Sequence, residues 1–193
     1  MTCTLCPASS RGADKFADIK AVLKSAHCVR FEFVSILHSS IFRQTDSSAG
    51  SAIIARDGRY RVKLGNDEFL NDSRSLYSYS QENNQVIVER VDSTIAFSKE
   101  VSYITRLDDF FKTYVVRAGA EYRLIRTAAG VRNIPDSMRI LLNRDKQQIE
   151  RLEYLDVNGE RVSVVIKNQQ MKGACDDRQF EADFPDSVER VKL

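Results

Sequence analysis

The chain has 193 residues, a length that favours one domain over two. Its 29 basic residues (Lys and Arg) and 27 acidic residues (Asp and Glu) give a net charge of +2, and this balance argues against nucleic acid as the main partner. The apolar runs stay well short of the roughly 18 residues that a membrane-spanning helix needs. These properties predict a soluble, or at most tethered, globular protein.

The first residues differ in character from the rest. Residues 1–12 consist largely of small side chains, so we expect a disordered segment there and a single domain over residues 13–193. Cys3 and Cys6 have CxxC spacing, but a zinc site needs further ligands and the two histidines lack the spacing of ligands. The segment resembles either the end of a secretory signal whose apolar part is missing or a tether in which Cys6 carries a lipid.

Two further cysteines, Cys28 and Cys175, lie in the body of the chain. They can pair as a disulfide if the compartment is oxidising, or remain as two buried thiols. The sequence leaves both alternatives open.

An amphipathic helix is predicted over residues 14–27, with Asp14 as its N-cap. Phe16, Ile19 and Leu23 recur at steps of three and four residues on one face, and lysines occupy the other face. The pattern indicates one helix with a narrow apolar stripe.

A series of short strands follows the helix. Alternation of apolar and polar residues begins at Val29, and its phase slips at Phe33–Val34, which indicates a bulge or burial of both faces there. Asp57–Gly58 and Asn158–Gly159 are strong signals of hairpin turns. The strands expected on these grounds lie near residues 29–34, 52–55, 60–64, 68–71, 76–79, 86–88, 114–117, 121–127, 138–142, 152–166 (a hairpin) and 180–184.

A second helix is predicted over residues 99–113, where Val101, Ile104, Leu107 and Phe111 fall at helical spacing. Residues 92–98 before it form either a short helix or a loop. About ten to twelve strands at intervals of roughly 8–12 residues, with few helices, predict a mainly β protein, a sandwich or a barrel. The alternation of strands and helices that marks a parallel sheet is absent.

Signatures of catalysis are missing from the sequence. There is no phosphate-binding loop, no dinucleotide-binding glycine motif and no nucleophile elbow. The acidic pairs Asp108–Asp109 and Asp176–Asp177 are typical of solvated helix or loop surface. We therefore predict a binding protein that is not an enzyme and needs no cofactor and no metal.

Five segments occur in a distinctive order. The first is an apolar strand that follows a glycine and ends in a turn with an arginine, and the second is a turn with an aspartate before Leu and Tyr. The third is the next strand along the chain, and the fourth is a pair of strands around an Asp-x-x-Gly turn. The last is a closing Phe-x-Phe-x-Pro motif. The segments are Gly50–Arg61, Asn71–Tyr79, Gln85–Val88, Ile149–Ile166 and Phe180–Pro185. In this order they resemble the LolA family of outer-membrane lipoprotein carriers over nearly the whole chain.

The resemblance implies an open, strongly curved antiparallel sheet, a half-barrel whose concave face is covered by a few lid helices. The cavity between sheet and lid would take the acyl chains of lipoproteins and carry them across the periplasm. The implied partners are an inner-membrane lipoprotein-releasing transporter and an outer-membrane acceptor. The resemblance further implies a monomer in the periplasm, its signal peptide removed, that needs no nucleotide or metal.

The resemblance also implies a set of binding residues. Arg56 matches a family arginine that is implicated in lid closure and cargo transfer, and five donors on its guanidinium suit hydrogen bonds to lid backbone. The two helical stripes are the candidate lid: Phe16, Ile19, Leu23, Val101, Ile104, Leu107 and Phe111.

Other interpretations of the same residues remain open. The stripes can simply cap a filled core, and Arg56 can be a solvated arginine at a hairpin end whose neighbour Asp57 pairs with another arginine. Asp57 and Tyr77 also depart from the family pattern, which has proline and tryptophan there. A lipid- or partner-sensing receptor of the LolB or RseB kind is the second function, followed by an enzyme acting on an envelope lipid and by a purely structural module.

Overall fold

The computed structural model describes residues 15–39, 41–91, 102–127, 134–143, 145–146, 148–156 and 158–193. Several predictions lie outside these residues: the N-terminal segment 1–12, the N-cap Asp14, the stretch 92–98 and the site residue Val101.

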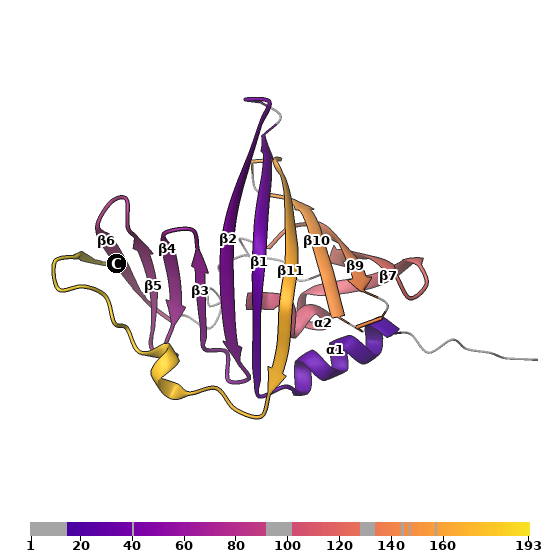
Figure 1. Cartoon of the computed structure of the whole chain (residues 1–193), viewed down its shortest axis with the longest axis horizontal. Coiled ribbons are helices and arrows are strands. Elements are labelled where there is room, and N and C mark those ends of the chain that lie inside the picture. Colours follow the sequence, from indigo (N-terminus) through magenta and orange to yellow (C-terminus); the bar gives the residue numbers. More distant parts are fainter. Residues whose placement is uncertain are drawn as a thin grey trace, which may run out of the picture.

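The described residues form one open sheet of twelve strands with two short α-helices on one side (Figure 1). The order is β12-β6-β5-β4-β3-β2-β1-β11-β10-β9-β8-β7, so β12 and β7 are its two edges. Neighbours are antiparallel except β12, which runs parallel to β6. The strands are β1 (Cys28–Ser39), β2 (Gln44–Ala55), β3 (Tyr60–Leu64), β4 (Asp67–Asn71), β5 (Ser75–Ser80), β6 (Gln85–Arg90), β7 (Phe111–Arg117), β8 (Glu121–Arg126), β9 (Ser137–Asn143), β10 (Gln148–Leu155), β11 (Arg161–Lys172) and β12 (Glu189–Lys192). The predicted mainly β, open antiparallel architecture is confirmed.

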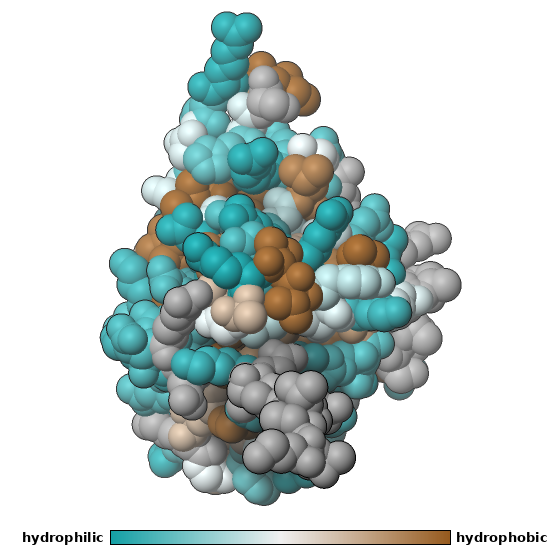
Figure 2. Space-filling model, turned by 90° about the vertical axis from the view of Figure 1, so that its right-hand side faces the viewer, coloured by the Kyte–Doolittle hydropathy of each residue, from teal (hydrophilic) through white to brown (hydrophobic). Residues whose placement is uncertain are grey.

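The long hairpin of β1 and β2 rises above the rest of the sheet (Figure 1). β2 begins at Gln44, earlier than predicted, because its polar first half has no apolar alternation and is recruited by pairing with β1 along its length. Ile41 and Phe42 at the tip are 74% and 75% exposed. Figure 2, which views the β7 side of the molecule, shows apolar atoms at this tip and on a largely hydrophilic face below it.

The phase slip at Phe33–Val34 reflects burial on both faces, one of the two alternatives predicted. Phe33 is buried and Val34 is half-buried, while the pairing with β2 and β11 runs through both residues without a shift. The shift in register between β1 and β11 falls instead between Arg30 and Glu32.

The two predicted helices differ in outcome. The helix α1 (Lys15–Ser25) forms as expected. The second is much shorter than predicted: a 3-10 turn η1 (Ser102–Arg106) leads into the four-residue α2 (Leu107–Phe110). The prediction that Phe111 to Thr113 are helical is wrong, because Phe111 already has extended backbone angles and begins β7. Phe110 and Phe111 are both buried where the helix ends and the strand begins, so in the sequence they look like the continuation of the apolar helical stripe.

The predicted last strand over residues 180–184 is also wrong. A 3-10 turn η2 (Asp177–Phe180), capped by the Asp176 side chain, leads into an irregular segment. Phe180 and Phe184 alternate because both pack onto a sheet face, in a cluster with Leu70 and Val86. The last strand is β12, which is recruited by β6 at the far edge.

The helices therefore cover one face of the sheet, and the C-terminal segment covers the other face over β2 to β6. Tyr60 and Val62 of β3 belong to the cluster under the helices. Leu70, which pairs with Arg61 and so points the other way, belongs to the cluster under the C-terminal segment. We call the helix-covered face the inner face and the opposite one the outer face.

Candidate functional site

The inner face meets α1, η1 and α2 in one apolar cluster, which we call the lid interface. Six of the seven predicted stripe residues are described, and all six lie in this cluster with at most 4% of their surface exposed: Phe16, Ile19, Leu23, Ile104, Leu107 and Phe111. Five of these residues lie in α1, η1 and α2, whereas Phe111 lies in the strand β7. The described helices and the sheet thus present apolar surfaces to each other.

Sheet residues supply the other half of the lid interface. Tyr122 and Leu124 of β8 and Ile140 of β9 are fully buried in the same cluster, and the ring of Phe16 lies 4.7 Å from the ring of Tyr122. The alternation of β8 and β9 turns these side chains inward. An aromatic contact of this kind adds about 0.5–1.5 kcal/mol beyond the area that it buries.

A polar contact joins the two helical parts at the rim. Lys20 of α1 forms an ion pair with Asp108 of α2, and its Nζ lies 3.4 Å from the Thr113 hydroxyl. Lys20 also lies over the ring of Phe16, 5.2 Å from its centre. Because Asp108 is half exposed, the pair holds α1 and α2 together only weakly.

Arg56 lies at the end of β2, beside the turn that leads out of α1. Its backbone N–H donates a 3.1 Å hydrogen bond to the carbonyl of His27, while its side chain is exposed and has no partner among the described residues. A pocket of about 370 Å³ adjoins it, lined also by His27 and Cys175. Arg56 is thus separate from the apolar lid interface but close to the point where α1 joins the sheet.

The charged residues that follow Arg56 in the sequence, Asp57 and Arg59, pair with each other and not with Arg56. Asp57 forms an ion pair with Arg59 at 2.8 Å, as one alternative interpretation supposed, and Arg59 also contacts Asp177 at 2.9 Å and the ring of Phe180. Partial burial lowers the pKa of Arg59, but the hydrogen bonds that its guanidinium donates to Asp177 and Asp57 outweigh this effect and raise the pKa overall. This cluster ties the C-terminal segment to the β2–β3 turn.

Cys28 and Cys175 form a disulfide, the first of the two alternatives that the sequence left open. Their Cα atoms are 5.1 Å apart, and the bond closes a sequence separation of 147 residues. It joins the start of β1 to the segment that crosses the outer face.

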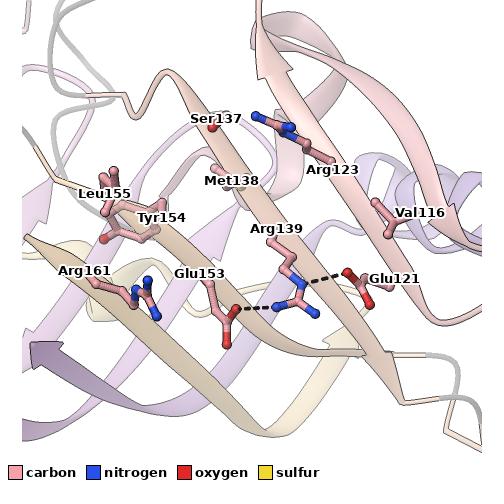
Figure 3. Close-up of a pocket in the computed structure, with 10 residues that line it drawn as sticks. All are labelled: Val116, Glu121, Arg123, Ser137, Met138, Arg139, Glu153, Tyr154, Leu155 and Arg161. Atoms are coloured by element: carbon pink, nitrogen blue, oxygen red, sulfur yellow. Dashed lines mark hydrogen bonds and ion pairs between the residues drawn. The ribbon is translucent and has the colours of Figure 1, made fainter. Parts of the chain in front are cut away.

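A second hollow lies on the outer face of β7 to β11, with a volume of about 440 Å³ (Figure 3). Arg139 lies in it between two carboxylates, at 2.7 Å from Glu121 and 3.3 Å from Glu153. The hydrogen bond from Arg139 holds the pKa of Glu121 below its usual range. This hollow was not predicted from the sequence, although the charged residues that alternate along β8 to β10 were a signal for it.

The described residues offer neither a metal site nor a membrane-spanning helix. No three His, Cys, Asp or Glu side chains in the described ranges are grouped so that they could hold a metal ion. None of the helices in those ranges has the length and hydropathy needed to span a bilayer.

The structure is thus an open, mostly antiparallel sheet with short helices packed by their apolar faces against one side. Residues 24–183 match the family model described as outer membrane lipoprotein carrier protein LolA, which is well over half of the chain. The chain belongs to the LolA family. Members of this family are carriers and not enzymes, and membership implies a lipoprotein-binding role. Together with the disulfide it indicates an extracytoplasmic protein.

Two of the solved structures that resemble this chain share its fold at low sequence identity. An uncharacterized conserved protein from Thermus thermophilus is 9% identical, with a TM-score of 0.55, over 92% of this chain and 99% of that one. A DUF1329 family protein from Desulfovibrio piger is 12% identical, with a TM-score of 0.51, over 88% and 95% of the two chains. A LolA superfamily protein from Nitrosomonas europaea is 10% identical, with a TM-score of 0.48, over 88% and 98%. No curated protein matches the sequence.

Proposed function

We propose that this protein is a periplasmic lipoprotein carrier that holds acyl chains between the inner face of its sheet and the lid helices. The observation that carries the proposal is the lid interface, in which the apolar stripes of α1, η1 and α2 face the apolar inner face of the sheet. Family membership supports the carrier role. Displacing the helices would open a continuous apolar surface of the kind that acyl chains require.

The energetics favour such an exchange. Each CH₂ group of an acyl chain contributes about 0.8 kcal/mol when it leaves water, so a lipoprotein with long chains needs an apolar cover to cross an aqueous space. The lid interface is itself apolar and packed, so acyl chains would replace one set of apolar contacts with another. Loading and release can then be close to balance without nucleotide hydrolysis or a bound metal.

Arg56 has a supporting role in this proposal. Its side chain is exposed beside the turn from α1 to β1, where a moving lid would pivot. A guanidinium with five donors can bind the carbonyl groups that a displaced helix or segment presents. Arg56 would thus stabilise one position of the lid, as the family arginine is implicated in doing.

The remaining parts of the proposal follow from the carrier role. The donor would be an inner-membrane lipoprotein-releasing transporter and the final recipient an outer-membrane acceptor, with the carrier moving between them as a monomer.

Equilibrium binding of a fluorescent triacylated cysteinyl peptide tests the proposal. We expect saturable binding at one site per chain, and no binding of the same peptide without acyl chains. Carrier activity is then measured as transfer of the bound peptide to acceptor vesicles. Absence of saturable binding would refute the proposed function, and binding without transfer would indicate a receptor or sensor on the same fold.

A further inference from the structure

A pocket of about 280 Å³ opens where α1 crosses the ends of β10 and β11. Its apolar lining comes from Ile19 and Val22 of α1 and from Met171 of β11, and Lys146 lies exposed on its rim. Ile19 belongs to the lid interface, and Met171 packs against it. The pocket is therefore an opening at the edge of the lid interface, between its buried core and water.

One buried polar side chain in this pocket has no partner. Gln169 is only 7% exposed, and within the described part of the chain neither its amide nitrogen nor its amide oxygen has a hydrogen-bond partner. Its backbone carbonyl, in contrast, accepts a 3.0 Å hydrogen bond from the side chain of Gln148. An unpaired buried amide is unfavourable, because two donors and an acceptor have lost water without replacement.

The backbone is shaped to place Gln169 there. In β11, Asn168 and Gln169 together lie opposite the single residue Phe31 of β1, since Lys167 pairs with Glu32 and Gln170 with Arg30. Asn168 takes the left-handed conformation at this bulge, with a φ of 51°. The bulge directs Gln169 to the same face as Met171, toward α1, and bulges that redirect a side chain are common beside functional sites.

We infer that Gln169 is the hydrogen-bonding contact for the carbonyl groups that link acyl chains to their headgroup. The inference rests on the proposed carrier function. Each chain of an acylated cysteine ends in an ester or amide carbonyl, which must lie at the boundary between the buried chain and the exposed peptide. Gln169 lies at that boundary, and its amide N–H groups would donate to such a carbonyl once α1 moves aside.

Two synthetic lipopeptides that differ only at this linkage test the inference. One is a diacylglyceryl-cysteinyl peptide with ester-linked chains, and the other carries ether-linked chains of equal length, which lack the carbonyl. We expect the wild-type protein to bind the ester form about tenfold more tightly, since one hydrogen bond to a buried partner is worth about that much. Gln169→Met is expected to abolish the preference by weakening only ester binding. It should also raise the melting temperature of the unliganded protein.

The matched control is Gln170→Met, which changes the adjacent, exposed glutamine on the opposite face. It should keep the preference for the ester form. If Gln169→Met binds the ester form preferentially, or if the wild-type protein does not distinguish the two peptides, the inference is wrong and the proposed function stands. If neither peptide binds to the wild-type protein, the proposed function fails and the inference fails with it.

Discussion

The lack of space around position 50, and not its backbone angles, requires a glycine there. A Cβ atom at this position would lie 2.4 Å from Cζ of Phe33 and 2.5 Å from the carbonyl oxygen of Lys63, both far inside contact distance. The ring of Phe33 and the backbone of β3 therefore require glycine in β2. This is also the glycine that begins the first segment resembling the family.

Gly50→Ala is expected to destabilise the fold by about 1–3 kcal/mol or more, as overpacking does in a filled core. The free energy of unfolding in urea measures the effect. Gly173→Ala is the matched control, because a Cβ there meets nothing within 4 Å and should change stability by less than about 0.5 kcal/mol. Equal stabilities of the two variants would show that Phe33 does not occupy the space beside Gly50.

Arg56 is expected to affect transfer more than binding. Arg56→Leu should bind the acylated peptide within about twofold of the wild-type protein but change the rate of transfer to vesicles several-fold, and Arg56→Lys should not restore the rate, because lysine lacks the planar fork of donors. Arg74→Leu, which removes another exposed arginine in the β4–β5 turn, is the control. A wild-type transfer rate in Arg56→Leu would leave Arg56 as a solvated hairpin residue.

At the scale of elements, an ion pair joins the two lid parts at the rim, among the described residues. Asp108→Asn removes the contact of α2 with Lys20 of α1, whereas Asp109→Asn removes only a local pair with Arg106. We expect both variants to lose less than about 1 kcal/mol of stability. Asp108→Asn alone should speed the uptake of a fluorescent acyl probe in stopped-flow measurements. If both variants take up the probe at the same rate, the ion pair does not restrain the lid.

The C-terminal segment depends on its covalent attachment. The disulfide closes a loop of well over a hundred residues, so its loss should cost about 2–5 kcal/mol, chiefly by freeing the unfolded chain. Thermal unfolding of the paired Cys28→Ser, Cys175→Ser variant, compared with the wild-type protein under oxidising conditions, measures this. The wild-type protein in reductant should unfold like the variant. A variant as stable as the oxidised wild-type protein would mean that the noncovalent contacts of the segment, among them those of Phe180 and Phe184, hold it without the disulfide.

At the scale of the whole molecule, the sequence predicted those parts of the fold that local chemistry decides. Asp57–Gly58 and Asn158–Gly159 set hairpins because their turns need residues that tolerate a left-handed backbone, and Gly58 and Gly159 both have a positive φ. The α1 stripe was predictable because all three of its apolar residues face one surface. These signals lie within a few residues of the structure that they specify.

The parts that were predicted wrongly depend on partners distant in sequence. β12 has no apolar alternation and becomes a strand only because β6 offers an edge. Phe180 and Phe184 have the alternating spacing of apolar residues in a strand, but the segment is not a strand and both side chains pack on the outer face. Among candidate site residues, the stripe could be identified from spacing, whereas the burial of Gln169 could not, because it depends on a bulge and on the packing of α1 across β11.

The central claim is that acyl chains lie between the inner face and the lid. Photo-cross-linking with a diacylglyceryl-cysteinyl peptide, with a diazirine at the end of one acyl chain, tests it directly when the adducts are located by mass spectrometry. We predict adducts on the inner-face residues Tyr122, Leu124 and Ile140 and on the α1 stripe, with competition by unlabelled peptide. Adducts confined to the outer face, around Arg139 or the C-terminal segment, would contradict it.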